Sequence, residues 1–152
     1  MLEKDLAYVA GFLDGDGCLM AQLVKRSGYI RGYQIRLSIV FYQKVQHISH
    51  LEWLKEQFGD GYIRKRNDGM AEYTIVGLEP VGRILKRISP HLRLKKELAD
   101  LILKISKMPR KLTIAEYLKY CKMVDETAKL TYSKKRTTTV TNVIEFLEKH
   151  KV

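Results

Sequence analysis

The chain has 152 residues, of which 45% are hydrophobic, so one domain can bury a sizeable hydrophobic core without disulfide bonds. It holds 28 Lys and Arg against 17 Asp and Glu, a net charge of +11, and its two cysteines, Cys18 and Cys121, are too few for a disulfide framework or a zinc site. No apolar run approaches the ~20 residues of a membrane span, and the N-terminus lacks a secretory signal. We therefore expect an intracellular protein, in the cytoplasm or an organelle, with a polyanionic partner and no membrane association.

The positive charge is segregated along the sequence. No Asp or Glu lies between Gly17 and Leu51, whereas five Lys and Arg do. Two further basic clusters occupy residues 64–66 and 134–136. A generally solvated basic surface is the alternative interpretation, but segregation favours a nucleic-acid footprint.

The first elements predict a helix followed by two paired strands. An apolar run over residues 5–13 is typical of a helix, ended by Gly15 and Gly17. Residues 19–24 and 33–42 alternate with a period of two, which predicts antiparallel strands with one polar, basic face.

The same pattern is repeated further along the chain, with no linker between the two halves. Predicted helices cover 45–58 and 79–88, and they flank strands 62–66 and 72–76 joined by the turn Asn67-Asp68-Gly69. Three more helices are predicted at 94–107, 113–130 and 140–150. The class is therefore α+β with an antiparallel sheet, in one domain over 1–152, with a core of about 5–108 and C-terminal helices and a basic loop at about 109–152.

The stretch LAYVAGFLDGDG, residues 6–17, is an apolar segment that ends in two consecutive Asp-Gly pairs. A polar helix-to-strand turn explains these residues when they are taken alone. An EF-hand loop is excluded, because Leu19 and Lys25 stand where its glycine and its final glutamate are needed.

Two features make a simple turn insufficient. The small residues Ala7, Ala10 and Gly11 are spaced to form one stripe, along which another helix could approach closely. In addition, a carboxylate leads directly into a basic strand face. A carboxylate repels phosphodiesters unless a divalent cation joins them, and Mg²⁺ prefers one or two carboxylates with phosphate oxygens and water.

Residues 9–17, VAGFLDGDG, resemble the motif of the LAGLIDADG homing endonucleases, and the predicted order matches that family's αββαββα core. The chain carries one motif, and single-motif members of this family are homodimers with the motif helices packed at the two-fold axis. The resemblance therefore implies a partner for the stripe of Ala7, Ala10 and Gly11. It also implies two copies of Asp16, one near each scissile phosphate.

The resemblance assigns chemical roles to a few residues. It implies that Asp16 binds the metal with the Gly15 carbonyl, while Asp14 is mainly structural. Gln43 and Lys95 match the positions that hold water and stabilise the transition state, although alone they read as a strand-end glutamine and a solvated lysine. The implied cofactor is Mg²⁺, or another divalent cation such as Mn²⁺, with no small-molecule cofactor. His47 falls where the family often carries a more basic residue, which would make activity pH-dependent.

The polar strand faces supply side chains suited to base edges in the major groove, since Arg pairs with guanine and Gln with adenine. The alternative is a face turned simply to water. The predicted DNA contacts on the strands are Gln22, Arg26, Gln34, Arg36, Ser38, Tyr42, Tyr62, Arg64, Arg66, Glu72 and Thr74. By resemblance, Ser133, Lys134, Lys135 and Thr138 would contact the DNA backbone.

The resemblance implies a homodimeric, Mg²⁺-dependent endonuclease that cuts both strands of a long, nearly palindromic double-stranded DNA site across the minor groove and leaves 3′ overhangs. Two alternatives share the fold: an intron RNA maturase and a DNA-binding regulator that does not cleave. Asp16 favours cleavage, because a pure nucleic-acid binder has no need of a metal-binding carboxylate.

Overall fold

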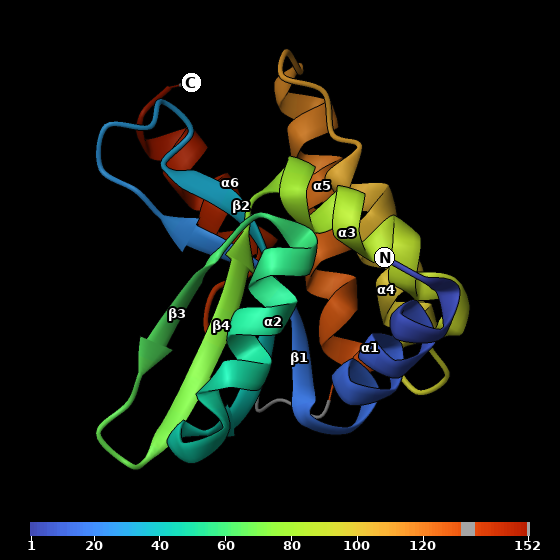
Figure 1. The fold of residues 1–152 in the computed structure, drawn as a ribbon. Coiled ribbons are helices and arrows are strands. Elements are labelled where there is room, and N and C mark those ends of the chain that lie inside the picture. The colour runs from blue at the N-terminus through green and yellow to red at the C-terminus, as the bar shows by residue number, and fades with distance from the viewer. Residues whose placement is uncertain (132–135, 152) are drawn as a thin grey trace.

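The molecule is built on one four-stranded antiparallel sheet in the order β1-β2-β4-β3 (Figure 1). The computed structural model describes residues 1–131 and 136–151. The strands are β1 (Gly17–Lys25), β2 (Tyr33–Lys44), β3 (Tyr62–Lys65) and β4 (Met70–Val76). The α+β class and the antiparallel sheet predicted from the sequence are therefore confirmed.

Helices α1 to α5 pack against the sheet or against one another, and α6 lies beside α5 and the far end of the β1–β2 pair (Figure 1). Their order around the strands confirms the αββαββα core with additional C-terminal helices. The helices are α1 (Glu3–Asp16), α2 (Ile48–Phe58), α3 (Leu78–Ile88), α4 (Lys96–Ser106), α5 (Ile114–Glu126) and α6 (Val140–Lys149), with 3₁₀ segments η1 (Val45–His47), η2 (Ser89–His91) and η3 (Thr127–Leu130). None of the described helices has the length and apolar character needed to cross a membrane.

The predicted alternation of β1 and β2 is confirmed by the burial of one strand face. Leu19, Ala21 and Leu23 of β1 are buried, as are the odd-numbered residues of β2 from Ile35 to Phe41. These side chains belong to a single hydrophobic cluster that extends from α1 to α6. The opposite face carries the even-numbered residues, which include the glutamines and arginines discussed below.

The β1–β2 register pairs Gly17 with Phe41 and Lys25 with Tyr33. Strand β4 pairs with β2 only from Ser38 onward, because the chain turns away into α3 at Gly77. Residues 33–37 of β2 therefore have a strand neighbour on the β1 side alone within the described structure.

Four of the predicted helices differ from the structure at a boundary or by a division. Helix α1 does not end at residue 13 but continues through Asp16, because the Gly17 N–H closes the last turn on the Leu13 carbonyl. Helix α4 begins at Lys96 rather than at residue 94, since the preceding amides bind a side chain of α1. The helix predicted over 45–58 is divided into the 3₁₀ segment η1 and α2, and the helix predicted over 113–130 is divided into α5 and the 3₁₀ segment η3.

Candidate active site and nucleic-acid interface

The C-terminal end of α1 presents an exposed carboxylate. Asp16 is the last residue of the helix, it is exposed, and its side chain makes no hydrogen bond or ion pair with the described residues. Gly15 is also exposed. No group of three or more His, Cys, Asp and Glu among the described residues could hold a metal ion. A cation at Asp16 would therefore take its remaining ligands from the Gly15 carbonyl, water, phosphate oxygens or a second protomer.

Asp14 ties the end of α1 to the turn before α4. Its Oδ2 accepts hydrogen bonds from the backbone N–H groups of Arg93 (2.8 Å) and Leu94 (3.2 Å), and its Oδ1 accepts one from Lys95 (3.0 Å). The Lys95 Nζ in turn donates to the Asp14 carbonyl at 2.8 Å. The predicted catalytic lysine thus lies at the carbonyl end of α1, where it is bound to Asp14, the residue two positions before Asp16.

Gln43 reaches the same end of the sheet through strand register. It lies on β2 two residues beyond Phe41, the partner of Gly17, and its Oε1 accepts the Lys44 N–H at 2.9 Å. His47 is exposed in η1, where its Nε2 lies 3.3 Å from the Gln46 Nε2. The fold therefore brings Gln43 and Asp16 to one side of the molecule.

Cys18 follows this acidic helix end on β1, and the sequence analysis gave it no role. Burial raises the pKa of the Cys18 thiol, and the positive charge of Lys95 partly opposes that shift. Burial therefore favours the protonated form of this thiol.

The predicted base-reading residues are joined in cross-strand pairs. The Arg36 Nη1 donates to the Gln22 Oε1 at 3.0 Å, and the Arg26 Nε donates to the Gln34 Oε1 at 3.1 Å. These bonds hold Arg26, the residue after β1, and Arg36 of β2 at neighbouring positions of the sheet. Guanidinium groups held in this way are suited to bidentate contacts with base edges.

Strands β3 and β4 carry a second kind of pair. The Arg64 guanidinium forms an ion pair with the carboxylate of Glu72, its direct partner across the ladder. Glu72 raises the pKa of Arg64 through a side-chain hydrogen bond and its negative charge. Arg66 is bound instead to Asp68 of the β3–β4 turn at 2.7 Å. Half of the surface of Tyr62 is exposed beside them.

The prediction that Ser38 and Thr74 contact DNA directly conflicts with their burial. Ser38 is 0% exposed and Thr74 is 7% exposed, because longer side chains on neighbouring strands cover them. Both residues line a hollow of about 280 Å³ in the middle of the polar sheet face. Met20 and Val40 also line it, although apolar residues on a polar strand face carry no sequence signal for a site. Arg36, Tyr42, Tyr62, Arg64 and Glu72 complete its walls.

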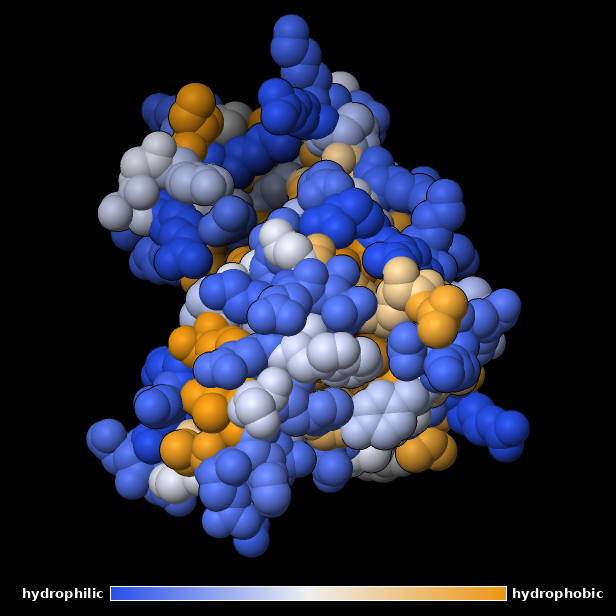
Figure 2. Space-filling model, in the orientation of Figure 1, coloured by the Kyte–Doolittle hydropathy of each residue, from blue (hydrophilic) through white to orange (hydrophobic). Residues whose placement is uncertain are grey.

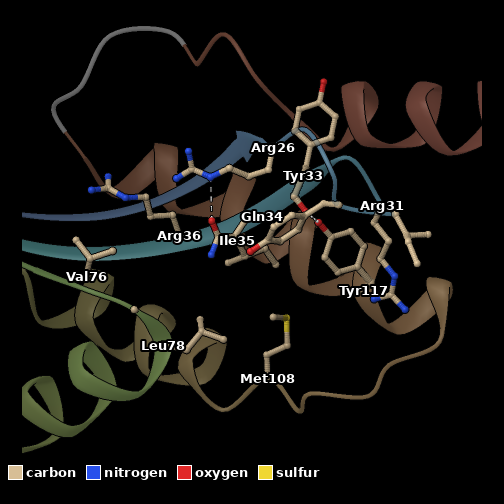
Figure 3. Close-up of a pocket in the computed structure, with 13 residues that line it drawn as sticks. Arg26, Arg31, Tyr33, Gln34, Ile35, Arg36, Val76, Leu78, Met108 and Tyr117 are labelled. Atoms are coloured by element: carbon tan, nitrogen blue, oxygen red, sulfur yellow. Dashed lines mark hydrogen bonds between the residues drawn. The ribbon is translucent and has the colours of Figure 1, made fainter.

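A larger cavity of about 560 Å³ opens at the unpaired edge of β2 (Figure 3). Arg26, Gln34 and Arg36 line it from the polar sheet face, so the cavity continues the predicted DNA interface. Figure 2 shows the surface hollowed between the end of the β1–β2 pair and helix α3.

Arg31 and Tyr117, which no sequence pattern connects, form one wall of this cavity. The Arg31 guanidinium lies 4.9 Å from the centre of the Tyr117 ring and donates to the Leu112 carbonyl at 2.5 Å (Figure 3). Burial raises the pKa of Tyr117, whose hydroxyl donates to the Tyr33 carbonyl.

The small-residue stripe on α1 differs from the prediction in one member. Ala7 and Gly11 are exposed, but Ala10 is 0% exposed and belongs to the core, because it lies on the buried face of α1 with Val9 and Leu13. Gly15 replaces it, since residues four apart share a helix face. Exposed Leu2, Tyr8 and Leu94 lie on or next to this helix.

The C-terminal contacts are described only in part. Ser133, Lys134 and Lys135 lie outside the described residues. Thr138 is half-buried and lines a hollow along β1 together with Arg136. The Arg136 guanidinium donates to the Ala21 carbonyl and, at 3.2 Å, to the Thr127 hydroxyl, so the segment after the basic loop is attached to the edge of β1.

The fold and the site define a class of basic α+β proteins that combine an arginine-bearing sheet face with an exposed carboxylate at the end of a helix. Residues 9–99 match the model of the LAGLIDADG endonuclease family. The chain belongs to this family, which confirms the resemblance of residues 9–17.

Two known DNA endonucleases are similar to this protein over nearly the whole chain. The DNA endonuclease I-CvuI of Chlorella vulgaris is 38% identical over 148 residues, covering 97% of this chain and 92% of its own. The DNA endonuclease I-CreI of Chlamydomonas reinhardtii is 35% identical over 148 residues, covering 96% and 90%.

Solved structures confirm the likeness in three dimensions. A crystal structure of the homing endonuclease I-CvuI in complex with its target, in the presence of 2 mM Ca, superposes with a TM-score of 0.92 at 36% identity, covering 98% of this chain and 96% of that one. The archaeal intron-encoded homing endonuclease I-Vdi141I complexed with DNA has a TM-score of 0.83 at 17% identity over 98% of each chain, which shows the shared fold alone.

Proposed function

We propose that this protein is a site-specific, divalent-metal-dependent DNA endonuclease that acts as a homodimer inside the cell, with all 152 residues in one domain. The observation that carries the proposal is the exposed Asp16 carboxylate at the end of α1, which bonds to none of the described residues. Lys95 is bound to Asp14 of the same helix end, and an arginine-bearing sheet face adjoins them. A pure nucleic-acid binder would gain nothing from a free carboxylate beside phosphodiesters, which repel it.

The metal site is proposed on the residues that the helix end offers. Asp16 and the Gly15 carbonyl are hard oxygen ligands, which suit Mg²⁺ and also accept Mn²⁺. When bound, such a cation neutralises phosphate charge and lowers the pKa of water to supply hydroxide. Two DNA strands require two such sites, so two protomers must bring their copies of Asp16 together.

The remaining roles belong to the side chains of this chain. We assign Lys95 to the charge that develops on the phosphate oxygens, since its ammonium retains two N–H groups after bonding the Asp14 carbonyl. We assign Gln43 to the orientation of the attacking water. The exposed small residues of α1 would form the dimer contact, with Ala7, Gly11 and Gly15 allowing the two helices to approach closely.

The sheet would bind the target in the major groove. The Gln22–Arg36 and Arg26–Gln34 pairs supply base contacts, while Tyr42, Arg64, Arg66 and Thr138 lie where they can add base or backbone contacts. A homodimer requires a long, nearly palindromic site, because each protomer reads one half. Cutting across the minor groove would leave 3′ overhangs.

The test is a cleavage selection with purified protein and a library of partly randomised palindromic DNA sites. The protein is incubated with Mg²⁺ or with EDTA, and Asp16→Asn is run in parallel. We expect double-strand cuts at one recovered sequence, lost in EDTA and in the variant, while the variant still binds that sequence. Normal cutting by Asp16→Asn would overturn the mechanism. Retention of a DNA site without cutting by the wild type would indicate a regulator instead.

A further inference from the structure

The turn that holds Lys95 has no capping side chain of its own. Helix α4 begins at Lys96 with Lys95 as its N-cap, and no side chain of this segment caps it. The first amides of a helix and of the turn before it need acceptors. Here the acceptors come from a residue about eighty positions earlier, the carboxylate of Asp14.

This single carboxylate receives three consecutive backbone N–H groups, from Arg93, Leu94 and Lys95, at 2.8, 3.2 and 3.0 Å. Leu94 is 73% exposed and Arg93 is exposed, so the side chains of the turn contribute little packing that could hold its shape. The conformation of residues 93–95 therefore depends on Asp14.

Lys95 is bound to Asp14 at both ends. Its backbone N–H binds the Asp14 carboxylate, and its Nζ binds the Asp14 carbonyl at 2.8 Å. The carbonyl end of a helix carries partial negative charge, which favours an ammonium group there. Asp14 thus fixes the position of both the Lys95 backbone and the Lys95 ammonium group.

We propose that Asp14 is a positioning residue for cleavage: it holds Lys95 at the end of α1, beside Asp16, without touching DNA or metal. The proposal rests on the catalytic role proposed for Lys95. It distinguishes two acids of one motif, since Asp16 is exposed and bonds to no residue within 1–131 or 136–151, whereas Asp14 accepts bonds from the turn before α4.

The substitution Asp14→Asn tests the proposal because the amide nitrogen cannot accept a hydrogen bond. The variant keeps one acceptor oxygen and turns an NH₂ group toward N–H donors, so the turn must shift. A displacement of about 1 Å in a catalytic group costs up to about 100-fold in rate. We expect the single-turnover cleavage rate at saturating protein to fall about 10- to 100-fold, with DNA affinity in EDTA unchanged within about threefold.

The decisive measurement is a double-mutant cycle with Lys95→Met. If Asp14 acts through Lys95, adding Asp14→Asn to Lys95→Met lowers the cleavage rate by less than about threefold. Full multiplication of the two losses would overturn the proposal, as would a wild-type rate in Asp14→Asn. Amide hydrogen exchange at residues 93–95 should accelerate in Asp14→Asn whether or not the protein cleaves DNA.

Asp125→Asn is the matched control. The Asp125 carboxylate also accepts a helix-end amide from a distant residue, the Val140 N–H of α6, at 2.9 Å, but it lies on α5. The Asp125→Asn variant should lose stability as Asp14→Asn does, but it should cleave DNA at the wild-type rate. If Asp14→Asn does not fold, the same cycle is run with Asp14→Glu, which keeps the charge and lengthens the side chain. Absence of cutting by the wild type would reject the proposed function, and not the contact between Asp14 and Lys95.

Discussion

Gln22 and Arg36 are direct partners across the β1–β2 ladder, and the Arg36 Nη1 donates to the Gln22 Oε1 at 3.0 Å. The glutamine therefore fixes the plane of a guanidinium that faces the proposed DNA. An arginine held in this way can read guanine through both of its donor positions, whereas a free one can settle on phosphate instead.

The first prediction concerns this pair. Gln22→Ala should relax discrimination at one base pair of each half-site by about 1–3 kcal/mol, while affinity for unrelated DNA stays the same. The measurement is the cleavage rate of every single-base variant of the recovered site. Gln34→Ala, which releases Arg26, is the comparison, because it should relax a different base pair. Equal weakening on all sites by both variants would contradict base reading by either pair.

The second prediction concerns the ion pair between Arg64 and Glu72. Glu72 places a negative charge on the face proposed to bind DNA, and its side chain is only 14% exposed. Glu72→Gln should strengthen non-specific DNA binding and steepen the dependence of log affinity on log salt by about one unit per protomer, because one more cation becomes available to phosphate.

The control for Glu72→Gln is Glu56→Gln, the same charge change at an exposed position of α2 on the helix side. It should leave the salt slope of non-specific binding unchanged. If both variants steepen the slope equally, net charge governs binding and Arg64 makes no particular contact.

Local sequence patterns predicted most of the fold because the determining forces are local. A period of two identified β1 and β2, and Asn67-Asp68-Gly69 identified the β3–β4 turn, where Gly69 has a φ of 83°. The predicted end of α1 was wrong by three residues. Its last turn is closed by a backbone bond from Gly17, which composition does not reveal.

The site was less predictable, since it depends on what covers a residue and on partners distant in the chain. Ser38 and Thr74 alternate correctly, yet long neighbours bury them. Ala10 has the right spacing on α1 but faces the core. The contact between Asp14 and Lys95 joins residues 81 positions apart, so only the folded chain could reveal it.

The third prediction concerns pH and the His50 ring, which packs in an aromatic cluster beside α1. The ring stacks on Trp53 with a centroid distance of 5.7 Å, lies 5.2 Å from Phe12, and its Nε2 is 3.2 Å from the Tyr8 hydroxyl. Partial burial lowers the pKa of His50 below its usual 6.5. The folded state therefore favours the neutral ring, while the unfolded chain takes up a proton first.

Stability from His50 should thus be fully present above about pH 6.5 and decline as the pH falls from there through the lowered pKa of the folded state. His50→Phe should remove this part of the pH dependence and leave the rest. The measurement is the free energy of unfolding by urea between pH 5 and about pH 8. Tyr8→Phe keeps the ring contact and removes the hydroxyl, so it should retain the decline. The same slope in wild type and His50→Phe would contradict the prediction.

The fourth prediction compares two glycines that follow α2. Gly59 and Gly61 both have positive φ, 70° and 93°, so alanine at either position carries the left-handed penalty of about 1–2 kcal/mol. A Cβ at Gly59 would meet nothing within 4 Å. A Cβ at Gly61 would collide with the Thr74 carbonyl, which belongs to β4 and cannot move without disturbing the sheet.

Gly61→Ala should therefore lower the free energy of unfolding by about 1–3 kcal/mol more than Gly59→Ala, the cost of forcing an extra group into a packed site. Urea unfolding at one fixed protomer concentration gives the comparison, because a dimer's stability depends on concentration. The Thr74 carbonyl lies in the strand that carries Glu72, so Gly61→Ala should also weaken discrimination between DNA sites. Equal destabilisation by the two alanines would mean that β4 yields at Thr74, and the sheet would then be less rigid than a base-reading surface requires.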